Sequence, residues 1–165
     1  MQDITIQLEQ ITKEILEDSA EIIAATAQEY YRDSFRRKGF DGVPWTPAQK
    51  ASGKGSLLVK SGALANSIRI AEVSHRRVVL AAGGDKVSYA QTHNEGYSGS
   101  VQIPEHIRKL KPKSLVSGTG KTEVTVRAHN RQLRIPRRQF MGQANELNEL
   151  IRNRLIGYIA GKTNQ

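Results

Sequence analysis

The chain contains no cysteine, few aromatic residues and no long apolar run. Without cysteine there is no disulfide scaffold, no thiol nucleophile and no cysteine-based zinc site. No apolar stretch approaches the ~20 residues that a membrane-spanning helix needs, and the N-terminus lacks the pattern of a signal peptide. We therefore expect a soluble protein that stays in the compartment where it is made and has no contact with membranes.

Aromatic residues make up 5% of the 165 residues, and there is a single Trp. A chain of this length is still long enough to bury a core of its own. We therefore expect a single domain over residues 1–165, with a modest aliphatic core and long exposed elements.

The 25 Lys and Arg outnumber the 16 Asp and Glu, but the excess is unevenly distributed. Residues 1–30 contain seven acids and one base, whereas residues 31–140 contain 21 bases and seven acids. A chain with this asymmetry attracts polyanions, acidic partner proteins or the acidic helix of a second copy. Charge alone does not choose among these partners.

The first third of the chain changes from strand-like to helix-like spacing. Residues 4–8 alternate apolar and polar, which predicts a short strand. Residues 9–37 carry an apolar stripe at helical spacing without Gly or Pro, which predicts one long helix with Gly39 as its stop. Residues 40–56 are expected to form a loop.

Shorter elements follow. Residues 68–73 and 77–82 are predicted to pair as antiparallel strands, and residues 89–94 to form a short helix that ends at Gly96. Residues 101–103 and 122–128 have the alternation of two further strands. Residues 108–121 lie between these strands and are basic, so we interpret them as the tip of a long hairpin.

An amphipathic helix is predicted from residue 143 to about residue 160. The order of helix, strands and helix indicates an α+β fold. In this prediction, the long N-terminal helix and the C-terminal amphipathic helix pack on one face of an antiparallel β-sheet. Residues 97–134 are predicted to be a long basic β-hairpin extension of the same domain.

One segment is partly similar to the phosphate-binding loop of nucleotide-binding proteins. It reads Ser117-Gly118-Thr119-Gly120-Lys121-Thr122. That loop needs a Gly where this chain has Leu115, and a helix where this chain continues with strand-like alternation. We interpret the segment as part of the hairpin tip.

No set of residues has the spacing of a catalytic or metal site. His93 and Glu95 match the His-x-Glu pair of zinc deaminases, but the other zinc ligands of those enzymes are cysteines. The remaining histidines show no ligand spacing, and no pair of acids stands out for acid–base chemistry. We therefore predict no cofactor, no metal and no enzymatic activity.

Basic residues concentrate in and after the predicted hairpin tip. They include Arg108, Lys109, Lys111, Lys113, Arg131 and Arg134. Such a cluster can neutralise phosphates, but no interleaved aromatic residues accompany it to stack on bases. Two interpretations stay open: sequence-nonspecific contact with the DNA backbone, and a solvated or protein-facing basic surface.

Four segments occur in a fixed order between the first and the last predicted helix. They are residues 40–45 (FDGVPW), residues 58–68 (LVKSGALANSI), residues 89–96 (Tyr89-Ala90 with His93-Asn94-Glu95-Gly96) and residues 135–142 (IPRRQFMG). In this combination the chain resembles the phage virion morphogenesis family, described as tail-completion or head–tail connection proteins of Mu-like phages and prophages. Residues 97–134 look like an extension beyond the shorter members.

The resemblance implies a structural protein of the virion, assembled in the cytoplasm of the bacterial host. It would act at the tail terminus or head–tail junction, where copies associate into a ring that contacts the tail tube or connector proteins. The alternative function is a basic, sequence-nonspecific nucleic-acid-binding protein.

Candidate contact residues follow from the charge pattern and the motif segments. For contacts between copies or with partners they are Glu14, Glu17, Glu21, Trp45, Arg137 and Arg138; for an acidic partner or nucleic acid they are the six basic residues named above. A different interpretation keeps the motif residues in the fold: Trp45 would anchor its loop, and Arg137 or Arg138 would pair with acids of the first helix.

Overall fold

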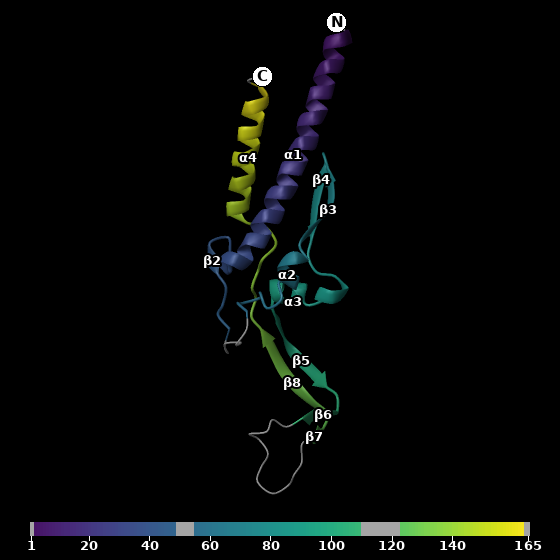
Figure 1. Cartoon of the computed structure of the whole chain (residues 1–165), viewed down its shortest axis with the longest axis vertical. Coiled ribbons are helices and arrows are strands. Elements are labelled where there is room, and N and C mark those ends of the chain that lie inside the picture. The colour runs from purple at the N-terminus through teal and green to yellow at the C-terminus, as the bar shows by residue number, and fades with distance from the viewer. Residues whose placement is uncertain (1, 49–54, 110–122, 164–165) are drawn as a thin grey trace. The chain divides into compact units, whose positions relative to one another are not determined.

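The computed structural model describes residues 2–48, 55–109 and 123–163 of the chain (Figure 1). In chain order the elements are α1 (Gln2–Arg37), β1 (Gly39–Phe40), β2 (Val43–Pro44), α2 (Ala63–Asn66), β3 (Arg69–Ser74), β4 (Arg77–Ala81), the 3-10 helix η1 (Asp85–Val87), α3 (Ala90–Glu95), β5 (Tyr97–Ile103), β6 (His106–Lys109), β7 (Glu123–Val126), β8 (His129–Ile135) and α4 (Asn145–Thr163). The α+β class is confirmed.

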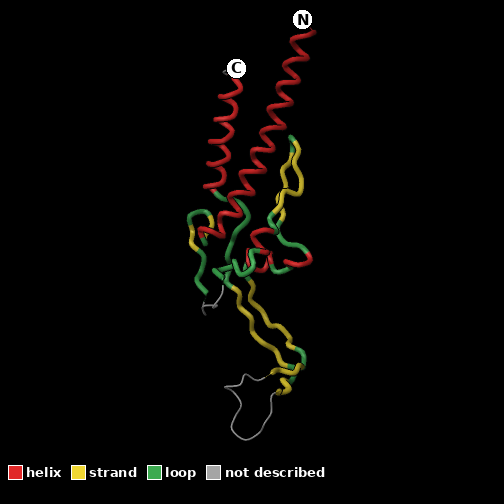
Figure 2. The backbone as a smooth tube through the Cα atoms, in the orientation of Figure 1, coloured by secondary structure: helices red, strands yellow, loops and turns green. Residues whose placement is uncertain are grey.

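The strands do not join into one sheet where the chain is described. They form four antiparallel pairs, β1–β2, β3–β4, β5–β8 and β6–β7, which Figure 2 shows as separate ribbons. The reason is local, because β1–β2 and β3–β4 are hairpins of neighbouring strands, and η1 and α3 separate β4 from β5. The predicted strand pair at 68–82, the short helix before Gly96 and the C-terminal helix are all found within a few residues of their predicted positions.

The described residues form two compact units. The first unit consists of residues 1–96 together with residues 136–165, and the second consists of residues 97–135. In the second unit β5 pairs with β8 in an unbroken register from Tyr97↔Ile135 to Ile103↔His129, and β6 pairs with β7. The predicted hairpin extension is present, but residues 101–103 pair with residues 129–131 and not with residues 122–128, and residues 108 and 109 belong to β6 and not to the tip. The rest of the predicted tip, residues 110–121, lies outside the described residues.

Helix α1 begins before the predicted helix does. Residues 4–8 are helical, so the predicted short strand is wrong. Their alternation is compatible with either structure over so few residues, and no turn residue separates them from the helix that follows. The helix therefore continues through them.

The C-terminal end of α1 was predicted at Gly39, but Lys38 takes the left-handed conformation there, with φ 55°. Gly39 already belongs to β1. A Cβ on Gly39 would lie 2.8 Å from the carbonyl oxygen of Val43, so the close approach of the two strands requires glycine.

The hairpin β1–β2 lies inside the segment predicted to be a loop. Asp41 and Gly42 form its two-residue turn with φ 49° and 73°. Positive φ at both positions is typical of a type I′ turn, for which Asp-Gly is a preferred sequence. The Asp41-Gly42 dipeptide is therefore the sequence feature from which this hairpin can be predicted.

The core of the first unit is built around aromatic rings, not around the aliphatic side chains that composition suggested. Six of the nine aromatic residues are buried in it: Tyr30, Tyr31, Phe35, Phe40, Trp45 and Phe140. The ring centroid of Phe35 lies 5.4 Å from that of Trp45 and 5.1 Å from that of Phe140. Several aliphatic residues of α1 are exposed instead, among them Leu8 and Ile11.

Helix α4 lies beside α1 and runs in the opposite direction (Figure 1), because later residues of α4 contact earlier residues of α1. Hairpin β3–β4 also packs against α1. Among the described helices, none is both long and apolar enough to span a membrane.

Replacement of Phe140 by Ala tests the aromatic core. Phe140 is 1% exposed, so its truncation should lower the free energy of unfolding by about 3–5 kcal/mol, measured by urea denaturation. The matched control is Ile156→Ala on α4, where the side chain is 59% exposed and the loss should stay within about 0.5 kcal/mol. Equal losses in the two variants would contradict this assignment of the core.

Candidate functional site

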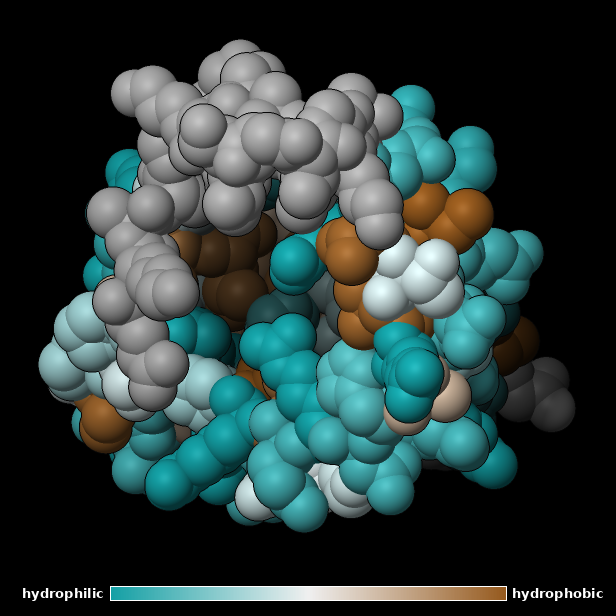
Figure 3. All heavy atoms as spheres, turned by 90° about the horizontal axis from the view of Figure 1, so that it is seen from below, coloured by the Kyte–Doolittle hydropathy of each residue, from teal (hydrophilic) through white to brown (hydrophobic). Residues whose placement is uncertain are grey.

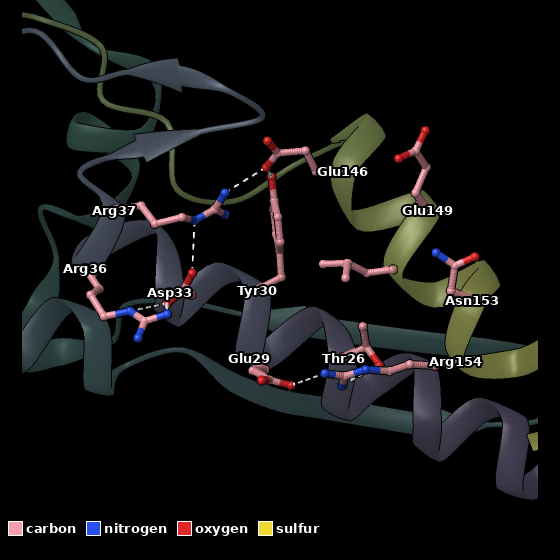
Figure 4. Close-up of a pocket in the computed structure, with 11 residues that line it drawn as sticks. Thr26, Glu29, Tyr30, Asp33, Arg36, Arg37, Glu146, Glu149, Asn153 and Arg154 are labelled. Carbon is pink, nitrogen blue, oxygen red and sulfur yellow. Dashed lines mark hydrogen bonds and ion pairs between the residues drawn. The ribbon is translucent and has the colours of Figure 1, made fainter. Parts of the chain in front are cut away.

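A charged groove of about 450 Å³ lies between α1 and the N-terminal half of α4 (Figure 4). At its centre the Oε2 atom of Glu146 accepts hydrogen bonds from the Tyr30 hydroxyl at 2.9 Å and from Arg37 Nη1 at 2.8 Å. Arg37 also pairs with Asp33 at 3.0 Å. The groove is thus lined by side chains that bind one another across the two helices.

These contacts change the titration of the groups that make them. The hydrogen bonds from Arg37 and Tyr30 hold the pKa of Glu146 below its ordinary value. The same carboxylate raises the pKa of Arg37, while burial is the main reason that the pKa of Tyr30 is raised. Glu146 is therefore ionised at neutral pH and suited to holding the two helices together.

The β1–β2 turn caps the start of α4. The backbone N–H of Glu146 donates to Asp41 Oδ1 at 3.0 Å, and the N–H of Asp41 donates to the Tyr30 hydroxyl at 3.1 Å. A carboxylate at this position satisfies a free N–H of the first turn and opposes the positive end of the helix dipole. The turn and the two helices therefore meet in one hydrogen-bonded network.

Further along the two helices, polar pairs continue the contact. Arg154 Nη2 lies 2.7 Å from Glu29 Oε2, and Arg154 Nη1 donates to Thr26 at 3.1 Å. The Tyr158 hydroxyl donates to Asp18, which raises the pKa of Tyr158 to about 12. Two acids of α1, Asp18 and Glu29, are thus engaged with α4 within the chain.

The segment that leads into α4 has no regular secondary structure before Asn145, and side chains satisfy its backbone. Asn94 Oδ1 accepts the N–H groups of Phe140 and Met141 at 2.9 and 3.0 Å. The Tyr31 hydroxyl donates to the carbonyl of Gly142 at 2.9 Å. This arrangement gives the His93-Asn94-Glu95-Gly96 motif a structural role.

Trp45 holds the same segment from the other side. Its Nε1 donates to the carbonyl of Gln139 at 2.6 Å, and the side chain is only 7% exposed. Trp45 therefore anchors its loop. The anchor points are the 136–144 connection, through the bond to Gln139, and the ring of Phe35 on α1. As a contact residue for a partner, Trp45 would need to become accessible.

The two arginines of the motif segments lie in different environments. Arg138 is 8% exposed, and its guanidinium donates to the carbonyls of Thr46 at 2.9 Å and Pro47 at 3.3 Å. Arg137 is more exposed and donates to Gln139. Within the described residues neither arginine pairs with an acid of α1, which differs from the suggested ion pair.

His93 is half-buried beside Arg138. Its carbonyl accepts the N–H of Arg138 at 2.8 Å, and its Nδ1 is buried without a hydrogen-bond partner among the described residues. Burial lowers the pKa of His93, and the nearby charge of Arg138 lowers it further. The arrangement favours the neutral imidazole.

The acidic candidates on α1 share one exposed face. Glu14, Glu17 and Glu21 are separated by three and four residues, which places them on the same side of a helix. Of the three, Glu17 lies 3.9 Å from Lys13, and the described contacts include no ion pair for the other two. Together they form an exposed acidic stripe (Glu14, Glu17 and Glu21), of which Glu14 is near enough to α4 to contribute to the raised pKa of Tyr158.

The basic candidates of the second unit are not gathered on one face. Arg131 and Arg134 are three residues apart on β8, so they lie on opposite faces of the β5–β8 ribbon. Arg108 and Lys109 are adjacent on β6 and likewise point to opposite faces. The two other basic candidates, Lys111 and Lys113, fall outside the described residues.

Within the described ranges there is no group of three or more His, Asp or Glu residues that could hold a metal ion. The predicted hairpin-tip segment at residues 117–122 lies outside those ranges. The residues that follow it, Glu123–Val126, form strand β7 as the alternation predicted. In the view of Figure 3, hydrophilic side chains predominate and hydrophobic ones are visible as separate groups.

The sequence model of the phage virion morphogenesis family matches residues 2–160. The chain belongs to this family. The match confirms the resemblance carried by the four motif segments and gives the protein a structural or assembly role in phage morphogenesis, as a component of the virion. No curated protein and no solved structure matches the chain significantly.

Asn94→Ala should destabilise the first unit of this phage protein. It leaves the N–H groups of Phe140 and Met141 without their acceptor, and the expected loss is on the order of 2–4 kcal/mol in urea denaturation. Asn94→Asp keeps an acceptor oxygen at the same place and is the matched control. Equal destabilisation by the two changes would contradict the role given to Oδ1.

His93 should make stability depend on pH. Its pKa is lower in the folded chain than in the unfolded chain, so the unfolded chain takes up the proton first as the pH falls. The stability from neutral His93 is complete above the ordinary pKa of about 6.5 and is lost as the pH falls from there through the folded value.

The measurement is the free energy of unfolding between about pH 7.5 and pH 5.5. His93→Gln should flatten the decline in this range, whereas His106→Gln, at an exposed position on β6, should leave it unchanged. A decline that is identical in all three proteins would show that His93 is not its source.

Proposed function

We propose that this protein acts at the tail terminus or head–tail junction of the phage particle. Copies associate into a ring, and the ring contacts the tail tube or the connector. Membership of the virion morphogenesis family supports an assembly role. The proposal of a ring at the tail terminus or head–tail junction rests in addition on how charge is divided along the chain.

The observation that carries the proposal is the unequal division of charged residues between the two units. The acidic stripe of α1 is exposed, while residues 97–135 contain eight Lys and Arg against two Glu. Acidic residues on one unit and an excess of basic residues in the other suit a head-to-tail contact between identical copies. Such a contact is heterologous. It closes into a ring when the rotation that relates one copy to the next is a whole fraction of a full turn.

The alternative, nonspecific binding to the DNA backbone, draws on the same basic residues. A protein that neutralises phosphates presents them on a continuous face. Arg131 and Arg134 lie on opposite faces of the ribbon, as do Arg108 and Lys109. This alternation favours contacts with protein surfaces on both sides of the ribbon over one DNA-binding face.

Loss of the protein should leave phage particles with unjoined heads and tails or with tails of aberrant form. The test is a nonsense mutation of its gene in the encoding phage or prophage, with electron microscopy of the lysate and complementation from a plasmid. Negative-stain images of the purified protein should show rings. Normal infectious particles without the protein would overturn the proposal. If the purified protein shifts the gel mobility of duplex DNA with a steep dependence on salt, the alternative of nonspecific DNA binding is favoured.

A further inference from the structure

Two apolar surfaces of the chain are largely exposed among the described residues. The first is on α1, where Leu8, Ile11 and Ile15 form a stripe that we call the N-terminal stripe. Leu8 is 60% exposed, Ile11 is 52% exposed and Ile15 is half-buried. Their spacing of three and four residues puts them on one side of the helix.

The N-terminal stripe continues the side of α1 that packs against α4. Asp18 and Thr26 contact α4 and follow Ile15 at helical spacing on the same side. Asp18 meets Lys162 at 3.8 Å, one residue before α4 ends at Thr163. The stripe therefore extends the α4-packing surface towards the N-terminus of α1, beyond Asp18.

The second uncovered surface is in the other unit, on the β5–β8 ribbon. No described residue between Tyr97 and Ile135 is buried. The register puts Tyr97, Val101 and Ile103 of β5 on one face. From β8, Leu133 and Ile135 lie on the same face, because they pair with Gly99 and Tyr97. We call this face the apolar ribbon face; the opposite face carries Ser, Asn, Gln and Arg side chains.

A ribbon of this kind is incomplete by itself. Two antiparallel strands are at best marginally stable in water and gain stability by packing against a third strand or a helix. The apolar ribbon face is the side that would receive such an element. Its partner must therefore present apolar side chains of its own.

The charges beside the two surfaces are opposite. Glu14 borders the N-terminal stripe, one turn from Ile11 and adjacent to Ile15. On the ribbon, Arg131 lies opposite Val101 and thus on the apolar face, where it is exposed. An acidic amphipathic helix and a basic amphipathic ribbon are complementary in both apolar pattern and charge.

The apolar part of the helix is also short enough to fit on the ribbon. The stripe from Leu8 to Ile15 extends over about 10 Å of helix, and the seven residues of β5 extend over about 20 Å. A helix segment of this length can lie along the ribbon with Glu14 near Arg131.

We propose that the N-terminal stripe of one copy packs on the apolar ribbon face of a second copy. This inference rests on the proposed function, because it names the contact that joins neighbours in the ring. Each copy gives its helix to one neighbour and receives the helix of the other neighbour on its ribbon. The contact is heterologous and uses a different surface on each side, as a closed ring requires.

The absence of cysteine allows a direct test by disulfide formation, since each introduced thiol is the only one in its chain. Ile11→Cys and Val101→Cys are prepared as separate full-length proteins, mixed and oxidised. The expected product is a mixed disulfide dimer on a non-reducing gel, identified by peptide mass. Since each chain carries one thiol, this product can form only between copies.

Two matched controls place the thiol next to these positions but on the other face. Gln10→Cys precedes Ile11 and lies about 100° around the helix, and Gln102→Cys follows Val101 on the polar face of the ribbon. The pair of control variants should give at least tenfold less mixed dimer than the test pair. Equal yields from both pairs, or no mixed dimer from the test pair, would overturn the proposed contact.

An Ile11→Cys/Val101→Cys double variant separates a contact within one chain from a contact between copies. It should give linked multimers. A cross-linked monomer as the main product would instead show that the stripe covers the ribbon of its own chain, which overturns the inference.

Charge exchange gives an independent readout. Glu14→Lys and Arg131→Glu should each lower the mass measured by light scattering at low salt, and an equimolar mixture should recover it. Arg134→Glu makes the same charge change on the polar face of the ribbon and should have a smaller effect. No recovery in the mixture counts against the contact. If these tests fail while loss of the gene still gives unjoined particles, the proposed contact is wrong and the proposed function is retained.

Discussion

The first unit depends on side chains that hold the backbone of residues 139–146. After the chain leaves this unit at Gly96 it returns only at Pro136, so α4 has to be joined to α1 by contacts distant in sequence. Trp45, Asn94, Tyr31 and Asp41 each bind one or two backbone groups of the returning segment. Because this segment has little regular structure of its own, these bonds fix where α4 begins and how it lies on α1.

Sequence reasoning succeeded where structure is decided locally. The helical spacing of α1 and α4, the stop at Gly96 and the β3–β4 pair follow from patterns within a few residues, and all were found. The strand predicted at residues 4–8 failed because five residues fit two periodicities. The Asp41-Gly42 turn was overlooked although its dipeptide is informative.

Partners distant in sequence were beyond this reasoning. The motif segments pointed to Trp45 and Arg138, but nothing in their spacing reveals that Trp45 binds the carbonyl of Gln139 or that Arg138 binds the carbonyls of Thr46 and Pro47. Counts of charged residues were limited in the same way, because they do not show which acids are paired within the chain. Asp18 and Glu29 belong to the acidic part of α1, yet both are engaged with α4, and only the structure separates them from the exposed acidic stripe.

The division of apolar residues between the two units bears on assembly. The first unit collects most of the aromatic side chains in one core, whereas the ribbon has no buried residue and carries its apolar side chains on one face. A segment with so little burial opens at low free-energy cost in the free protein and gains order when a second surface covers it. Ordering opposes association, so the contact between two free copies is weak. Each contact in a closed ring is reinforced by the others, and this arrangement favours complete rings over isolated pairs of copies.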